Sequence, residues 1–531
     1  MSTHVIHARS PRGPVGRLDL DRDPDHLARY LEDAASVPGG HAYGIVSPRT
    51  EADVAAIVSG PHAVLPIGAQ SSLTGGATPR GELLLSTSRM TDISIASGHV
   101  TAGPGVTLTS LDAALGAADA WYPPGPTYLG ATVGGIVATN AAGAATFKYG
   151  ATRQWVEALA VVLPQGEVLD LRRGDVVADA AGTFEIHLSN RTVHVRVPEY
   201  RWPDVPKVSA GYYAAPGMDL VDLFVGAEGT LGVVTSVTLR TVPIRPAVVM
   251  ALVHCPDRAT SLRLVAELRS ASRQTWSNGD ARGVDIAAIE HMDQRSLDLL
   301  RADGADRRAD VRVPSDTALS LLVTVELPSA LGQARAYDEL GQALEPGAPD
   351  TPLVRFCRLL ARHGVLDRTE LALGAARQAQ FLALREAVPI AVNSRIVRAR
   401  RKVDPSMQKV AADVIVPFER LTELLEGCDR EIGGRGLDGA VWGHISDGNL
   451  HPNVLPRTTA ELRAGQDAVL AIGRLAITLG GSPCAEHGVG RNPIKQQLVR
   501  ELVGEAGIDA MRRIKEALDP ERKLAPGVLG I

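Results

Sequence analysis

The sequence lacks the features that mark several large classes of protein. Its four cysteines are dispersed with no Cys-x-x-Cys spacing, which excludes a ferredoxin-like cluster or an all-cysteine zinc site within this chain. Aromatic residues make up only 4% and the net charge is -5, so neither base stacking nor a basic surface points to nucleic acid. Apolar runs such as Ala247–Cys255 fall short of the roughly 18–20 residues that span a bilayer. No apolar signal segment follows the N-terminus, and we expect a reduced cytoplasmic protein, with attachment to a membrane surface left open.

The 531 residues show an α+β pattern that changes character once along the chain. Between residues 36 and 246, short apolar runs alternate with glycine-rich turns, which indicates many short strands. Pro243 and Pro246 punctuate the end of this part, and longer helical patterns follow. We therefore predict a lead-in (1–35), a first domain (36–246), a second α+β domain (247–480) and a C-terminal segment (481–531).

Two segments concentrate glycine and small hydroxyl residues. Leu65–Gly76 follows a predicted strand, and a loop of this composition can turn several backbone N–H groups toward a phosphate. Gly130–Gly143 has small residues at many positions, which let a flat ligand approach the backbone. A plain surface turn and tight helix packing are the structural alternatives. Neither segment matches G-x-G-x-x-G or GxxxxGK[ST], so a Rossmann domain or a P-loop is unsupported.

A third segment, His444–His451, predicts a hairpin that brings two imidazoles together. Asp447-Gly448 is a preferred two-residue turn, and a hairpin centred on it makes His444 face His451. Directly opposed residues have Cβ atoms about 4.5–5.5 Å apart, close enough to share one ion. Glu486 is the natural third ligand of such a site. Without it, two surface histidines beside a turn would be the simpler interpretation.

The order of these and other motifs resembles a known family. P-x-G-x-x-S-S-L-x-G-G, YPPGPTYLGATVGGIVATNAAG, KYG and GAEGTLG (Gly226–Gly232) resemble the FAD-binding domain of the vanillyl-alcohol oxidase superfamily. GHISDGNLHP, EHGVG and DPERKLAPG, which follow in that order, resemble its branch of D-lactate dehydrogenases, glycolate oxidase D-subunits and D-2-hydroxyglutarate dehydrogenases. The resemblance runs from about residue 40 to the end. It implies an α+β fold with an FAD-binding domain and an α+β cap domain of the FAD-linked oxidase C-terminal type.

The resemblance further implies FAD, with the first glycine-rich segment around the pyrophosphate and the second along the ribityl and isoalloxazine groups. Covalent members carry a histidine where this chain has Gln70-Ser71-Ser72, so non-covalent FAD is expected. The implied metal is zinc, manganese or a similar divalent ion on His444, His451 and Glu486. The implied FAD-contacting residues are Pro66, Gly68, Ala69, Gln70, Ser71, Ser72, Leu73, Pro124, Gly130, Ala131, Thr132, Gly134, Gly135, Thr139, Asn140, Gly143, Glu228, Gly229 and Val233.

The carboxylate of an acid substrate needs a cation. Arg385 offers a bidentate fork and Lys409 a point charge, and both align with substrate-binding positions of the resembled family, as does Asn453. A surface charge on a helix and a solvated loop are the structural alternatives for Arg385 and Lys409. Pro389 stands where hydroxyglutarate enzymes carry a threonine, which argues against hydroxyglutarate.

These residues together predict oxidation of a D-2-hydroxy acid. His487 would take the hydroxyl proton while the C2 hydrogen leaves as hydride to flavin N5. D-lactate is the first expected substrate, with glycolate or a larger 2-hydroxy acid as the alternative. A non-redox FAD-dependent synthase or lyase, a metal-dependent hydrolase and a flavin subunit that is inactive alone are the rival functions. The expected partner is an external electron acceptor: a quinone, a cytochrome, an electron-transfer flavoprotein or an iron–sulfur subunit. No nucleic acid is expected as a partner, and whether the protein forms a homodimer is left open.

Two further segments have no role in this scheme. Phe184–Val197 alternates around Ser-Asn and predicts an exposed hairpin. Residues 393–403 contain five Arg or Lys residues and are expected to form a solvated loop. That basic run could instead help to bind a more anionic acid, an acidic partner subunit or a membrane surface.

Overall fold

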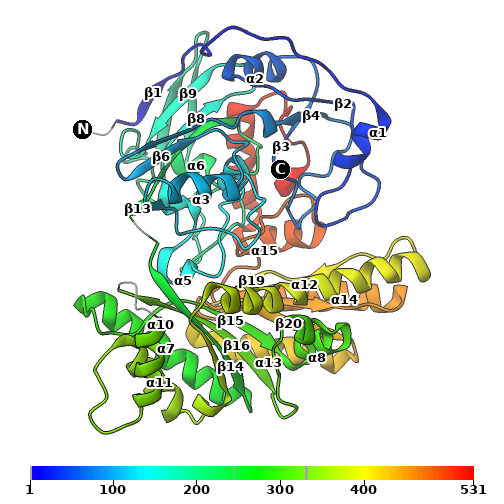
Figure 1. Cartoon of the computed structure of the whole chain (residues 1–531). Coiled ribbons are helices and arrows are strands. Elements are labelled where there is room, and N and C mark those ends of the chain that lie inside the picture. Colours follow the sequence, from blue (N-terminus) through cyan, green and yellow to red (C-terminus); the bar gives the residue numbers. More distant parts are fainter. Residues whose placement is uncertain (1–2, 244, 329–332) are drawn as a thin grey trace. The chain divides into compact units, whose positions relative to one another are not determined.

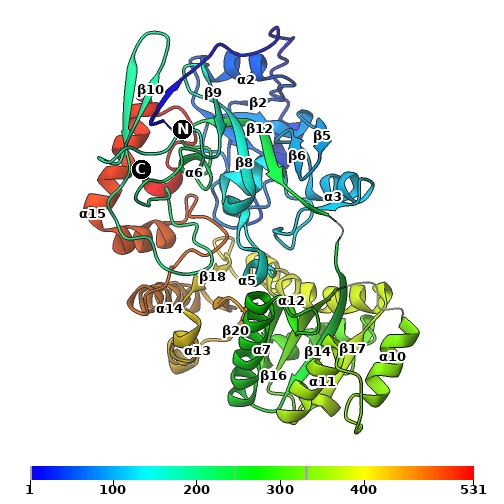
Figure 2. The same cartoon turned by 90° about the vertical axis from the view of Figure 1, so that its left-hand side faces the viewer.

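The computed structural model describes residues 3–243, 245–328 and 333–531 (Figure 1, Figure 2). The chain divides into two compact units: residues 1–143, 150–244 and 480–531 form the first, and residues 144–149 and 245–479 form the second. The sequence interpretation had assigned the short segment 144–149 to the first domain. None of the described helices is both long enough and apolar enough to cross a membrane.

The first unit is built on two main sheets. One is parallel, with the order β2-β4-β3 (Gly44–Val46, Leu83–Ser86, Val64–Ile67). The other is antiparallel, with the order β5-β6-β12-β8-β9 (Ile93–Ala96, His99–Ala102, Val233–Arg240, Val156–Val162, Val168–Arg172). Strand β12 alternates buried and more exposed positions, as a sheet with one covered face requires. The predicted α+β class is confirmed.

The predicted hairpin at residues 184–197 is present, but it is not exposed on both faces, since Phe184, Ile186 and Val195 are buried. It consists of β10 and β11 (Thr183–His187, Thr192–Arg196), and β1 (Val5–His7) pairs with β10. The C-terminal helix α15, red in Figure 2, lies beside this hairpin, where Arg191 donates to the carbonyl of Ala517. The other elements of the unit are β7, β13, α1, α2, α3, α4, α6 and α15 (Ala120–Trp121, Val242–Pro243, Pro24–Leu27, Glu51–Val58, Leu108–Gly116, Val133–Ala138, Val221–Phe224, Pro493–Leu518).

The second unit contains one large sheet with the order β17-β14-β16-β15-β20-β21-β18, and β19 also pairs with β21. The strands span Thr369–Ala372, Ala247–Cys255, Leu319–Leu327, Asp285–Asp293, Gly439–His444, Asn449–Val454, Val410–Ala411 and Val414–Ile415. Strand β14 is buried on both faces from Val249 onward, since helices cover both sides of the sheet. The central strands are labelled in Figure 1.

The helices of the second unit lie on opposite faces of its sheet. Helices α8 and α12 (Gln294–Asp303, Ala375–Lys402) share a core with Met250, Leu322 and Trp442. Helix α11 packs on the other face, against Val249. The remaining helices are α5, α7, α9, α10, α11, α13 and α14 (Thr146–Tyr149, Arg258–Asn278, Ala305–Arg308, Gln333–Gln342, Pro352–Arg362, Leu421–Ile432, Thr459–Thr478).

Helix α12 corrects the expectation for the basic run. It continues through Pro389 to Lys402, so the run lies in a helix and not in a loop. A proline inside a helix costs about 3 kcal/mol because it lacks an N–H and crowds the preceding turn. The buried face formed by Val388, Val392 and Ile396 offsets that cost through tertiary packing.

Candidate functional site

The first glycine-rich loop has a backbone arrangement that suits an anion. Backbone N–H groups of residues 69–73 donate to no acceptor among the described residues. Gln70 adopts the left-handed conformation (φ 50°), which turns successive N–H groups toward one side. Its side chain is anchored to the carbonyls of Tyr30 and Ala77 at 2.9 and 2.8 Å. A run of unpaired donors in a partly buried loop fits the pyrophosphate that the resemblance implies.

The second glycine-rich segment lies against the first. A Cβ on Gly68 would stand 2.3 Å from the Oγ1 of Thr132, so only glycine permits this approach. Thr132 caps α4, where its Oγ1 accepts from the N–H of Gly135 at 3.3 Å. Further along, a Cβ on Gly143 would be 2.4 Å from the carbonyl of Gly125, which places the segment after Pro124 beside this loop.

The other motifs of the first unit converge on the same region. Gly229 faces Pro66, with 3.5 Å between its hypothetical Cβ and the proline ring. Asn140 donates to the carbonyl of Val208 at 3.2 Å. At Gly490, a Cβ would clash with Thr74 at 2.3 Å. The first loop therefore lies against Gly229 and, through Thr74, against Gly490, while Asn140 of the second segment contacts Val208.

Glu486 is held by a lysine that the sequence interpretation missed. Lys207 donates to Glu486 Oε2 at 2.7 Å, and its side chain is fully buried. Ser209, two residues further on, fixes the same segment because it accepts from the N–H of Gly488 at 3.0 Å. The buried ammonium keeps the Glu486 carboxylate charged and fixed in place, which suits its oxygens to bind a cation.

His487 is the exception in a buried stretch. Every other residue from 481 to 490 is buried, whereas the His487 side chain is 27% exposed. Its Nε2 lies 3.5 Å from Glu486 Oε1. An imidazole held at the rim of a rigid segment can exchange a proton with a bound molecule.

Glu228 ties this segment to the GAEGTLG motif. Its carboxylate accepts from the N–H groups of Val489 and Gly490 at 2.7 and 2.8 Å. Complete burial raises the pKa of Glu228 to about 7, although these bonds and Lys495 oppose the rise. The carboxylate therefore positions the 484–490 segment, and a contact with the flavin stays a prediction.

In the second unit, the predicted hairpin register is wrong. Strand β20 pairs with β21 so that Trp442 faces His451. Asp447 and Gly448 belong to a wider turn, since the N–H of Asp447 bonds to the carbonyl of His444. His444 and His451 are nevertheless diagonal neighbours, both buried, with ring centroids 5.3 Å apart in an edge-to-face arrangement. The two imidazoles lie together despite the wrong register.

Carboxylates contact each of these histidines. Strand pairing sets Glu290 directly opposite His444, and the Glu290 carboxylate contacts His444 Nδ1. Asp413 lies 3.5 Å from His451 Nδ1. The Glu290 carboxylate on His444 Nδ1 favours the tautomer that presents Nε2 to a metal, whereas Asp413, at 3.5 Å, acts on His451 through its charge alone. The donor set of the described second unit thus fits a divalent ion.

Arg385 reaches the same face from α12. Its Nε donates to Glu290 Oε2 at 2.5 Å, and its side chain is only 9% exposed. Burial alone would raise the pKa of Glu290, but Arg385 and His444 outweigh it and hold that pKa well below its usual range. Arg385 is therefore a buried, oriented cation and not a surface charge.

Lys409 and Asn453 complete this face. Lys409 precedes β18, whose Ala411 pairs with Asn453, so strand alternation directs Lys409 toward the same side. Lys409 makes no ion pair with any described residue, and burial lowers its pKa to about 8. Asn453 Oδ1 is buried without a hydrogen-bond partner among the described residues. An uncompensated cation and an unsatisfied acceptor favour a ligand here.

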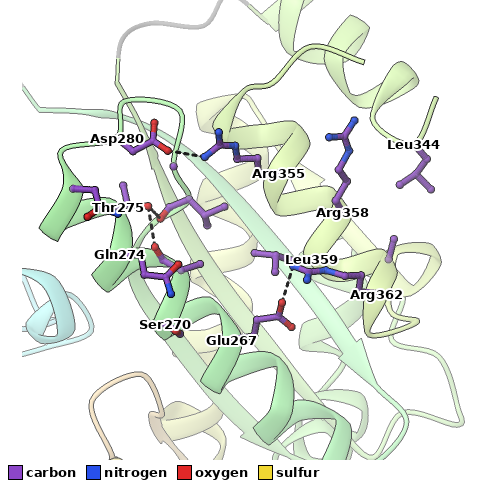
Figure 3. Close-up of a pocket in the computed structure, with 15 residues that line it drawn as sticks. Glu267, Ser270, Gln274, Thr275, Asp280, Leu344, Arg355, Arg358, Leu359 and Arg362 are labelled. Carbon is purple, nitrogen blue, oxygen red and sulfur yellow. Dashed lines mark hydrogen bonds and ion pairs between the residues drawn. The ribbon is translucent and has the colours of Figure 1, made fainter. Parts of the chain in front are cut away.

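A separate cavity of about 820 Å³ lies between α7 and α11 (Figure 3). Its charged groups largely pair with one another: Arg355 with Asp280 at 2.7 Å and Arg362 with Glu267 at 2.6 Å. None of the predicted site residues lines it.

Two protein-family models match the chain. The family model described as "FAD binding domain" matches residues 42–172. The model described as "FAD linked oxidases, C-terminal domain" matches residues 256–529, which is more than half of the chain.

Similar proteins include hydroxy-acid enzymes by name. The glycolate oxidase subunit GlcD of Bacillus subtilis is 27% identical over 97% of this chain and 92% of its own length. A probable mitochondrial D-lactate dehydrogenase of Danio rerio is 26% identical over 91% and 83%. The D-2-hydroxyglutarate dehydrogenase of Xanthomonas citri is 28% identical over 97% and 95%.

A solved structure supports the fold. An alkyldihydroxyacetonephosphate synthase matches with a TM-score of 0.56 and 14% identity, over 98% of this chain and 88% of that one. Both domain models, the motif order and this fold agree. The chain belongs to the FAD-linked oxidases and is a flavoprotein oxidoreductase with an FAD-binding domain and the C-terminal domain of that family.

Proposed function

We propose that this protein oxidises a D-2-hydroxy acid of the D-lactate type to the 2-oxo acid, with non-covalent FAD as the hydride acceptor. The observation that carries the proposal is the lone cation Lys409 on the same sheet face as the buried pair His444 and His451. A 2-hydroxy acid has a carboxylate for the cation and an adjacent hydroxyl for a metal. Relatives named for D-lactate, glycolate and D-2-hydroxyglutarate support the class.

The cations of the second unit would bind the acid. Lys409 supplies a charge without a counter-ion, and Arg385 supplies a fork whose plane is fixed by Glu290. Asn453 adds a buried polar side chain, with its Oδ1 lacking a hydrogen-bond partner among the described residues, to the face that would bind the acid. With carboxylate and hydroxyl both held, the enantiomers would differ in the direction of the C2 hydrogen, and only one of them could direct it at the flavin.

His444 and His451 would hold a divalent ion, zinc or manganese, with Glu486 as the third ligand. When bound, such an ion lowers the pKa of a hydroxyl that it coordinates, and FAD supplies the hydride acceptor at N5. His487 would take the hydroxyl proton at a ring nitrogen, because its side chain reaches the rim of an otherwise buried segment.

The test is an anaerobic absorbance spectrum of the FAD- and zinc-loaded protein with D-lactate, L-lactate, glycolate, D-2-hydroxyglutarate and larger 2-hydroxy acids. Bleaching of the flavin bands by D-lactate but not L-lactate is the expected result. If only another acid bleaches the flavin, that acid is the substrate in place of D-lactate, and the proposed reaction stands. Flavin bands that resist every acid would favour a synthase or lyase, and a colourless protein after refolding with FAD would favour a hydrolase.

The flavin must then pass its electrons on. We propose an external acceptor, either a quinone, a cytochrome, an electron-transfer flavoprotein or an iron–sulfur subunit, because the four buried cysteines are all free. We also propose a cytoplasmic location, with peripheral membrane attachment as the alternative, and a homodimer as the assembly to test.

The affinity for the acid should depend on pH through Lys409. Its pKa of about 8 means that the ammonium is charged below pH 8 and neutral above it. We expect kcat/KM for D-lactate to level off below pH 7.5 and to fall toward tenfold per pH unit above pH 8.5. In Lys409→Arg the side chain stays charged, so the fall should disappear. An identical fall in that variant would assign the titration to another group.

A further inference from the structure

Glu290 occupies a position that the proposed chemistry does not yet use. It lies on β15, and strand register sets it opposite His444 on β20 and opposite Leu322 on β16. Its two oxygens have different partners: Oε1 contacts His444 Nδ1, and Oε2 accepts from Arg385 Nε at 2.5 Å. The Glu290 side chain is 7% exposed. One buried carboxylate therefore joins the predicted metal ligand to the predicted substrate cation.

The contact with His444 fixes how that imidazole is presented. With the proton on Nδ1 directed at Glu290, the ring presents Nε2 as the ligand atom. A carboxylate behind a ligating histidine also makes the ring more basic and holds its orientation. Without Glu290, the ring could rotate or exchange tautomers, and both would weaken binding of a metal.

The contact with Arg385 fixes the guanidinium. Glu290 holds Nε, and Glu386 Oε1 lies 3.4 Å from the terminal nitrogen Nη1, so two carboxylates fix the plane in which the guanidinium can meet a substrate carboxylate. The negative charge of Glu290 also compensates a cation that is itself almost buried. Without Glu290, Arg385 would lose the carboxylate that orients its Nε, although the longer contact of Nη1 with Glu386 Oε1, at 3.4 Å, would be left.

We propose that Glu290 is a positioning residue shared by the metal ligand His444 and the acid-binding Arg385, so that one side chain sets the affinity for both metal and substrate. The inference rests on the proposed function and deepens it. It makes a joint prediction: a change at Glu290 alters metal affinity and acid affinity together, although Glu290 itself touches neither ligand.

The chain offers a matched control for this test. Glu267 on α7 also joins an arginine to a histidine: its Oε1 pairs with Arg362 at 2.6 Å and its Oε2 with His363 at 2.5 Å. It lines the cavity of Figure 3, which contains none of the predicted site residues. Glu290→Gln and Glu267→Gln therefore each remove one negative charge that lies between an arginine and a histidine, the first at the predicted site and the second away from it.

The experiment measures zinc affinity of metal-stripped protein by equilibrium dialysis, and D-lactate affinity from anaerobic flavin reduction. In Glu290→Gln we expect the zinc dissociation constant to rise about 10–100-fold. The dissociation constant for D-lactate should rise about tenfold in the same variant. Glu267→Gln should match the wild type in both. In a His444→Ala background, Glu290→Gln should have little further effect on zinc, because the two residues act as one unit.

A second variant keeps the inference testable if Glu290→Gln does not fold. Glu290→Gln combined with Arg385→Gln removes both charges, so no unpaired guanidinium stays buried. It should fold and still bind zinc about 10–100-fold more weakly. Zinc affinity at the wild-type level in either folded variant would overturn the inference and leave the function standing. A wild-type protein that binds no zinc and is reduced by no acid would overturn the proposed function itself, and with it the inference.

Discussion

Replacing His487 with glutamine should leave a folded yellow protein that D-lactate barely reduces. We expect the rate of anaerobic flavin reduction to fall about 10²–10⁴-fold, the usual contribution of a positioned general base. The flavin spectrum should be unchanged, since the His487 side chain is partly exposed and its buried neighbours carry the packing of the segment. Stopped-flow absorbance at saturating D-lactate measures the rate directly.

His187 provides the control for this prediction. It also lies in the first unit, its side chain is 32% exposed, and its Nε2 contacts a nearby carboxylate, that of Glu185, at 2.6 Å. Its strand belongs to the hairpin β10–β11 and holds no predicted site residue. His187→Gln should reduce its flavin at the wild-type rate. Fast reduction in His487→Gln would show that another group takes the proton.

Sequence alone was sufficient where chemistry depends on local composition. The composition of Leu65–Gly76 predicted a loop with its backbone donors turned outward, and those of residues 69–73 do lack partners among the described residues; phosphate binding there stays a prediction. The hairpin at residues 184–197 followed from strict alternation around a turn. In both cases neighbours in sequence determine the structure.

Sequence reasoning failed where distant packing decides. The Asp-Gly pair favoured a tight hairpin, but pairing of β15 with β20 fixes the position of His444, and the turn widens to suit it. Helix α12 continues through Pro389 because its apolar face, with Val388 and Val392, is buried against the sheet. A short-range rule could foresee neither outcome, because the deciding contacts come from other strands.

The two missed ion pairs have the same origin. Glu290 lies 154 residues before His444, and Lys207 lies 279 residues before Glu486. Nothing in the composition near either residue distinguishes it from a surface charge. A signal was nevertheless present: Glu290 follows the apolar run Ile286–Ile289 within a strand, and a charge at such a position needs a buried partner.

The second large effect concerns stability. Lys207→Met should lower the melting temperature by on the order of 10 °C, because it leaves the Glu486 carboxylate buried without its cation. Removing one partner of a buried ion pair usually costs about 3–5 kcal/mol, whereas removing both is often nearly neutral. The double variant Lys207→Met, Glu486→Gln should therefore recover most of the loss. Thermal unfolding of the FAD-loaded protein, followed by circular dichroism, measures both.

Zinc distinguishes a purely structural ion pair from one that serves a metal site. If Glu486 also binds zinc, the zinc ion supplies the positive charge that Lys207→Met has removed. Zinc should therefore raise the melting temperature of Lys207→Met more than that of the wild type. The double variant has lost the ligand and should respond least. Equal shifts in all three proteins would separate Glu486 from the metal, and the Lys207–Glu486 pair would then serve only to hold the segment that carries His487.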